Sequence, residues 1–157
     1  MVQVAIEYMI LTPVLILLIF LLPLTANAVV NSYANSRQTS ELKDISSHLG
    51  STIQQVYFSL NHETIPPSTV SFNTGIPPLL EGYKYTVNGT SRADPISGAT
   101  IVNFQLRLDG SGVTTNSSIT LGPNVVWINS FFFSNSASAY ISATKSSNST
   151  IQIRIPS

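Results

Sequence analysis

Near its start the chain has 22 consecutive residues without a charge, from Met9 to Val30. As a helix rising about 1.5 Å per residue, this segment would be about 33 Å long, enough to cross the hydrocarbon core of a bilayer. Its apolar residues fall on all sides of a helix, so no face is suited to water. A cleaved secretory signal would begin with a basic region and have a shorter apolar core, whereas the first basic residue here is Arg37. The sequence therefore predicts an apolar helix over residues 1–30 that meets lipid or other helices.

Two prolines interrupt this run, Pro13 and Pro23. Each lacks a backbone N–H and clashes with the preceding turn, which costs about 3 kcal/mol in an ordinary helix interior. Membrane helices tolerate proline because neighbouring helices and Ser/Thr side chains satisfy the freed carbonyls. Thr12 and Thr25 stand close enough to do this. The expected result is a bend or a locally loosened turn.

Residues 31–61 change to an amphipathic pattern. The apolar residues are separated by 3, 4, 4, 3 and 4 positions, which is the spacing of one helix face; they are Leu42, Ile45, Leu49, Ile53, Val56 and Leu60. Gly50 interrupts this helix at a cost of about 1 kcal/mol. The pair Pro66–Pro67 predicts that the helix ends near Asn61. We expect the first helix to continue into this one, with the apolar stripe covering a head domain.

Residues 67–157 follow a two-residue period instead. The segments Thr100–Leu108 and Thr150–Ile155 alternate apolar and polar side chains most regularly, as strands with one buried face do. The further expected strands are Thr69–Asn73, Tyr83–Val87, Ser118–Leu121, Val125–Phe133 and Ala139–Thr144. Turn-forming residues separate them, at NGT, DGSG, GPN and KSSN. The predicted fold class is α+β, with the long helix followed by an antiparallel β-sandwich-like head.

The segment from Trp127 to Phe133 is more apolar than one buried face requires. As one strand, it would point Trp127, Phe131 and Phe133 to one side and Ile128 and Phe132 to the other. Either the strand is central and covered on both sides, or part of it contacts a neighbouring subunit. The first alternative is the one we expect.

Composition argues against most ligand chemistry. Only 9% of residues are charged and the net charge is zero, so no basic patch for nucleic acid is expected. The chain has no cysteine, which removes disulfides, thiolate metal sites and cysteine nucleophiles. His48 and His62 lack a metal-ligand spacing and are expected on the surface. Asp94 and Asp109 precede Pro95 and Gly110 and are expected in turns. We predict no metal, no cofactor and no enzymatic activity.

The N-terminal residues Gln3-Val4-Ala5-Ile6-Glu7-Tyr8, followed by the apolar run, resemble the start of archaeal type IV pilins. The absence of cysteine and the hydroxyl-rich head, with 38 Ser and Thr residues in the chain, are also similar to archaeal pilins and archaellins. The resemblance implies processing by a class III signal (prepilin) peptidase and assembly, from the membrane, by pilus machinery. Unlike the family's basic leader, only Met1 and Val2 precede Gln3. Either a leader was removed upstream of Met1, or a minimal leader is cut before Gln3, which makes Glu7 the fifth mature residue.

Glu7 is the only charged residue among the first 36. A lone carboxylate in hydrocarbon is costly, so it must be paired, hydrogen-bonded or protonated. In a stack of such helices, the N-terminal amine of a neighbouring copy is the available cation. Alternatively, Glu7 lies at the membrane interface, where its charge suits the start of the helix dipole.

Three Asn-x-Ser/Thr sequons begin at Asn88, Asn116 and Asn148, all in expected turns of the head. Such positions expose a flexible acceptor, and Asn88 is the strongest candidate because Asn-Gly favours a tight type I′ turn. The sequence thus predicts a filament subunit at the cell surface. In it, apolar helices with Glu7, Pro13 and Pro23 assemble with copies of themselves, and the glycosylated heads mediate adhesion or attachment. The alternative is a single-pass membrane-anchored β-sandwich binding module or minor pseudopilin. A secreted enzyme is disfavoured.

Overall fold

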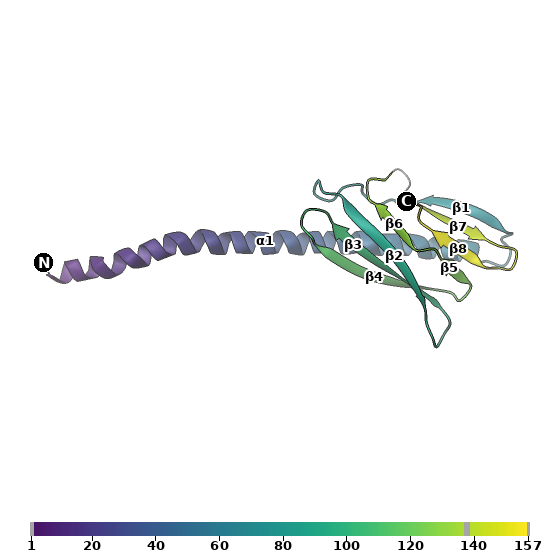
Figure 1. Ribbon diagram of the computed structural model, residues 1–157, viewed down its shortest axis with the longest axis horizontal. Coiled ribbons are helices and arrows are strands. Elements are labelled where there is room, and N and C mark those ends of the chain that lie inside the picture. Colours follow the sequence, from purple (N-terminus) through teal and green to yellow (C-terminus); the bar gives the residue numbers. More distant parts are fainter. Residues whose placement is uncertain (1, 137–138, 157) are drawn as a thin grey trace. The chain divides into compact units, whose positions relative to one another are not determined.

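The computed structural model describes residues 2–136 and 139–156, without the side chains of residues 2–8 and 10. Its internal contacts divide the chain into two compact units, Met1–Arg37 and Gln38–Ser157. The division falls inside the helix α1 (Val2–Leu60). The first unit is helical throughout its described residues, and the second, which we call the head, combines the end of α1 with eight described strands (Figure 1).

Within the head, α1 is amphipathic as the sequence predicts. All six residues of the predicted stripe are buried, from Leu42 to Leu60. Close packing explains the glycine at position 50, because a Cβ atom built there would lie 2.8 Å from Cγ2 of Ile119. The nearby hydroxyls of Ser46 and Ser117 hydrogen bond to each other. The helix therefore lies close against strand β4 (Thr114–Leu121).

α1 ends at Leu60, as predicted, and the side chain of a buried lysine from a distant strand contacts the turn after it. The ammonium of Lys145 donates to the carbonyl oxygens of His62 at 2.8 Å and Ile65 at 2.9 Å. Cations near the C-terminus of a helix also interact favourably with the helix dipole. Lys145 thus holds the turn between α1 and the first strand in place.

The strands form two four-stranded sheets, which Figure 1 shows as two groups of arrows. One sheet has the order β1-β7-β8-β5, and its strands are β1 (Ser68–Asn73), β7 (Tyr140–Lys145), β8 (Ile151–Arg154) and β5 (Val125–Trp127). The other has the order β4-β3-β2-β6, with β3 (Thr100–Leu108), β2 (Tyr85–Ala93) and β6 (Ser130–Phe133) beside β4. All described pairings are antiparallel except β5–β8, which is parallel and departs from the expected all-antiparallel head.

Two predicted strand boundaries are wrong in ways that matter. β2 does not end at Val87 but continues through Asn88-Gly89 to Ala93, so NGT is not a turn. β4 begins at Thr114 instead of Ser118.

Asp94 and Asp109 lie at turns, as predicted. The Asp94 carboxylate accepts hydrogen bonds from the backbone N–H groups of Ile96 and Ser97 and from the Ser97 hydroxyl. These hydrogen bonds, the Ser97 hydroxyl first, lower the pKa of Asp94.

The predicted strand Val125–Phe133 is two strands in different sheets. β5 pairs with β8, and after Ile128 and Asn129 the chain joins β2 as β6. The Ser130 hydroxyl stabilises the crossing, since it donates to the Ile128 carbonyl at 2.8 Å and accepts the Ile155 N–H at 3.2 Å. The crossing resets the side-chain alternation: Trp127 and Phe132 are buried, while Phe131 and Phe133 are 51% and 47% exposed. The prediction that this segment is covered on both sides is therefore wrong.

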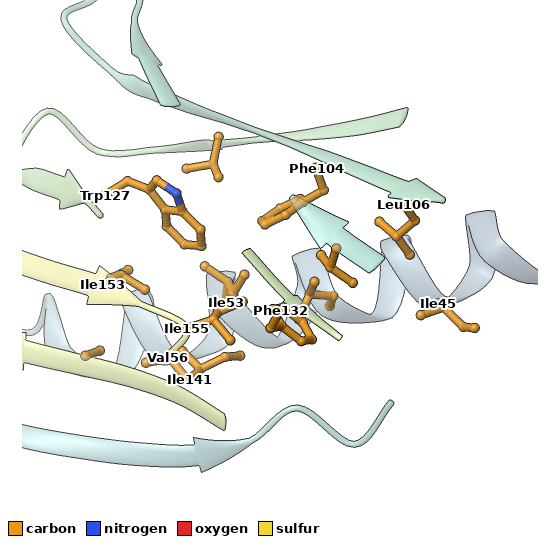
Figure 2. Packing of buried hydrophobic residues seen from close by; sticks show 14 of the residues in the cluster. Ile45, Ile53, Val56, Phe104, Leu106, Trp127, Phe132, Ile141, Ile153 and Ile155 are labelled. Carbon is orange, nitrogen blue, oxygen red and sulfur yellow. The ribbon is translucent and has the colours of Figure 1, made fainter. Parts of the chain in front are cut away.

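The core of the head joins α1 to both sheets. Figure 2 shows helix residues Ile53 and Val56 meeting Phe104 and Phe132 from one sheet and Ile153 from the other. The buried hydrophobic residues of the described chain are Leu42, Ile45, Leu49, Ile53, Val56, Tyr57, Leu60, Leu80, Tyr85, Val87, Val102, Phe104, Leu106, Leu108, Leu121, Val125, Trp127, Phe132, Ile141, Ala143, Ile151, Ile153 and Ile155. Neither sheet could bury its inner face without the other elements.

Trp127 couples the two sheets. Its indole N–H donates to the Gly89 carbonyl at 3.0 Å, and its ring packs edge-on against Phe104 with ring centroids 5.7 Å apart. A Cβ atom on Gly89 would lie 2.8 Å from Cζ2 of Trp127. Glycine is therefore required at position 89 by the close approach of the indole and not by a turn.

Replacing Gly89 should test this contact. Gly89→Ala is expected to destabilise the head by about 1–3 kcal/mol, because an extra methyl group in a tightly packed core forces its neighbours to move. Urea unfolding of the full chain in detergent micelles, followed by the fluorescence of Trp127, the chain's single tryptophan, measures the change. Thr90→Ala, an exposed position on the same strand, should stay within about 0.5 kcal/mol. Equal stability of the two variants would contradict the proposed reason for glycine.

Candidate assembly surface

The most unusual surface of the chain is the apolar part of α1. Every side chain from Leu11 to Val30 is exposed within its unit, and Phe20 and Leu24 are each 68% exposed. By length and composition, α1 contains one segment able to cross a membrane, and its most apolar window is unburied. A membrane-spanning helix and a signal sequence near an N-terminus share these properties.

This surface is too apolar to stay in water. Burying a side chain such as leucine, valine or phenylalanine is worth about 1.5–3 kcal/mol, and this segment carries many of them in succession. Single exposed apolar residues are common on proteins, but a continuous apolar surface marks a site that binds lipid or protein. The segment contains no charged side chain that would favour water or direct a particular partner. What it can do is bury itself among lipid tails or other apolar helices.

Neither proline ends the helix. α1 continues through Pro13 and Pro23, and whether its axis bends there stays a prediction. Thr25 donates to the carbonyls of Leu21 and Leu22, at 3.0 Å each. The carbonyl deprived of its donor by Pro23 is that of Ile19, four residues earlier. Thr25 therefore does not satisfy the freed group, and that part of the expectation is wrong.

Gln3 and Glu7 belong to the backbone of α1, but their side chains lie outside the described residues. The predicted roles of Gln3 in processing and of Glu7 in assembly therefore stay predictions.

The three sequons do not share the predicted setting. Asn88 lies within β2 and Asn116 within β4, where their residues are paired in the sheet, so the prediction that they occupy turns is wrong. Both side chains are exposed. Only Asn148 lies in a turn, where its side-chain oxygen accepts the Thr150 N–H at 3.2 Å and the Ser149 N–H donates to the Ser146 carbonyl at 3.0 Å. Asn148 thus replaces Asn88 as the sequon in a turn, the setting that suits an acceptor.

The structure brings two of the sequons together. Asn88 and Asn116 both pair with Gln105, one from each neighbouring strand, so all three are adjacent on the outer face of the sheet. Gln105 does not stand out in the sequence as a site residue. Alternation along the strand signals that its side chain points outward, but the register that places it between two asparagines is not visible in the sequence.

The described residues show no arrangement for metal binding. No group of three or more His, Asp or Glu side chains among them lies close enough to hold a metal ion. His48 and His62 are exposed, as predicted. Burial raises the pKa of Tyr85, whose hydroxyl donates to the Pro77 carbonyl at 2.6 Å, so this phenol stays protonated as a structural hydrogen-bond donor.

Comparisons with known proteins give no relative on which to base a function: no family model matches the chain, and no match was found among curated proteins or solved structures.

Proposed function

We propose that the chain is a structural subunit of an extracellular type IV pilus-like filament. In this proposal the apolar helices bundle into the filament core and the heads form its outer sheath, suited to adhesion or surface attachment. The observation that carries the proposal is the exposed apolar surface from Leu11 to Val30, which is attached to a folded head with its own core. The resemblance of residues Gln3–Tyr8 to archaeal type IV pilins supports the same assignment.

The charge distribution also favours self-assembly. The chain carries 7 basic and 7 acidic residues, so packing many copies side by side meets little electrostatic repulsion. Exposed Phe131 and Phe133, 5.4 Å apart between ring centroids, give the head an aromatic surface beside its polar strands. Before assembly the helix would reside in the membrane, where a prepilin peptidase and the pilus machinery are the expected partners.

The second candidate is a single-pass membrane protein that displays the head as a binding module, or a minor pseudopilin. The length of the apolar segment supports this function equally well. The two proposals differ in where the protein accumulates. A filament subunit is recovered in sheared extracellular fibres, and electron microscopy of that material identifies them, whereas an anchored module stays in the membrane fraction.

Removing the apolar segment should separate solubility from folding. A chain that begins at Asn31 is expected to be a soluble, folded, β-rich monomer, because the buried residues of the core all lie between Leu42 and Ile155. Circular dichroism and sedimentation in the absence of detergent measure the two properties, with the full chain as the control. Fibres formed by the shortened chain would contradict a helix-based core.

Changing Glu7 tests whether its carboxylate acts in assembly. Glu7→Ala should leave the unfolding of the head unchanged but lower filament yield by about tenfold, because a charge-assisted hydrogen bond is worth about 1.5–3 kcal/mol. Glu7→Gln separates the charge from the hydrogen bond. Glu63→Ala, which removes an exposed carboxylate from the head, is the matched control. Normal filament yield from Glu7→Ala would show that this carboxylate is incidental.

Asn148 should carry a glycan in native material. Its turn is exposed between β7 and β8, and a bulky sugar there meets no packing conflict. Peptide mass spectrometry should find added hexose-type mass on the peptide containing Asn148, and Asn148→Gln should abolish it. An unmodified peptide from native filaments would refute this assignment without bearing on assembly.

A further inference from the structure

Three neighbouring strands bring neutral amides into one row on the outer face of the β4-β3-β2-β6 sheet. The register pairs Asn116 with Gln105 and Gln105 with Asn88. All three side chains are exposed. Neighbouring strands lie about 4.8 Å apart, so the three amides are spaced on the scale of a sugar ring.

A second polar row lies beside the first. Asn103 pairs with Ser118 on one side and Thr90 on the other, two residues further along each strand. The two rows line an open depression of about 470 Å³, to which Phe104 and Ser117 also contribute. This volume is within the range of small-molecule sites in proteins.

Strand geometry explains why two sequons fall here. Residues two apart on a strand point to the same face, so Asn-x-Thr or Asn-x-Ser in a strand presents an amide and a hydroxyl side by side. Asn88 with Thr90, and Asn116 with Ser118, form two such pairs in the same depression. Their sequence pattern is thus explained by a shared polar face, without glycosylation.

The charge of the depression restricts its ligand. None of its lining residues is ionisable. Arg107 pairs with Thr86 and Thr114 in the row beyond Gln105, and Arg92 lies in the row beyond Thr90, so both arginines lie outside the lining. Binding of nucleic acid needs a positively charged groove. The lining itself offers a ligand hydrogen bonds but no charged partner, which suits an uncharged ligand.

The chemistry of the lining favours polyhydroxylated ligands. Each amide offers both donors and acceptors, and each hydroxyl offers both as well, which matches the two-way hydrogen bonding of sugar hydroxyls. Phe131 pairs with Asn88 and continues the amide row onto β6. Its exposed ring, held edge-on against Phe133, provides an apolar surface for the C–H face of a sugar. Polar edges and an apolar face are the two surfaces that a pyranose ring presents.

We propose that Asn88, Gln105 and Asn116, with Asn103, Thr90 and Ser118, form a binding site for an uncharged oligosaccharide. Asn88 and Asn116 act as hydrogen-bonding side chains of this site and are not glycan acceptors. The proposal concerns the head alone, so it does not depend on whether the chain forms filaments.

Binding can be measured on the full chain in a detergent without a sugar head group, such as lauryldimethylamine oxide. Titration calorimetry with cellohexaose and mannohexaose, against oligogalacturonate of the same length, should show binding of at least one neutral probe and weaker binding of the anionic one. The double variant Asn103→Ala/Gln105→Ala should weaken that binding by about tenfold or more, since each lost hydrogen bond is worth about 1 kcal/mol. Neither residue belongs to a sequon, so the variant leaves every possible acceptor intact.

Gln152→Ala, an exposed glutamine on β8 of the other sheet, is the control and should bind as the unchanged chain does. Unfolding followed by Trp127 fluorescence establishes that each variant is folded, and Gln105→Glu provides a second, nearly isosteric change. The proposal is overturned if neither neutral probe binds, if the double variant binds equally well, or if oligogalacturonate binds more tightly. A glycan found on Asn88 or Asn116 in native material overturns it too, because the glycan would fill the depression.

Discussion

α1 carries two kinds of apolar surface, and only one of them is buried within its own compact unit. Between Leu42 and Leu60 the buried apolar residues share one broad face, which the two sheets of the head cover, while Phe58 is exposed. Between Leu11 and Val30 they occupy every face and remain exposed within their unit. Because apolar burial is the main favourable term in folding and association, contact with lipid or with other helices would stabilise the second surface. The proposed filament and the membrane-anchored alternative both provide such contact.

The sequence predicted those parts of the fold that short-range patterns determine. The helical stripe from Leu42 to Leu60 repeats every three or four residues, and Thr100–Leu108 and Ile151–Arg154 alternate every two, so each element could be assigned from its own residues. Pro66 disfavours helix at Ile65, so α1 is expected to end before this residue, and it ends at Leu60. These signals depend on residues close together in sequence, and the structure confirms the elements predicted from them.

The predictions that were wrong concern positions whose structure depends on contacts between residues far apart in sequence. Asn88-Gly89 has the composition of a tight turn, but the glycine is required because the Trp127 indole packs against it from the other sheet. The apolar run from Val125 to Phe133 has no clear alternation, so its crossing between sheets could not be located. That crossing is held by hydrogen bonds of Ser130, one of them to Ile155. Likewise, the polar depression could not be predicted, because its residues come from three strands whose register is set by the whole head.

The two proposed activities use different physical forces on different units. Burial of the helix is non-directional and grows with apolar area, so it can hold many copies together without specifying a ligand. The amides and hydroxyls of the head act through directional hydrogen bonds, which contribute modest affinity. They discriminate between ligands, because a polar group that a ligand leaves unpaired has given up its hydrogen bond to water without replacing it. The balanced charge of the head suits both, since its acidic and basic residues are equal in number and copies of it repel one another little. A filament of such subunits would repeat a weak sugar site along its length, and repeated weak sites raise the overall affinity for a surface that bears many copies of the same sugar.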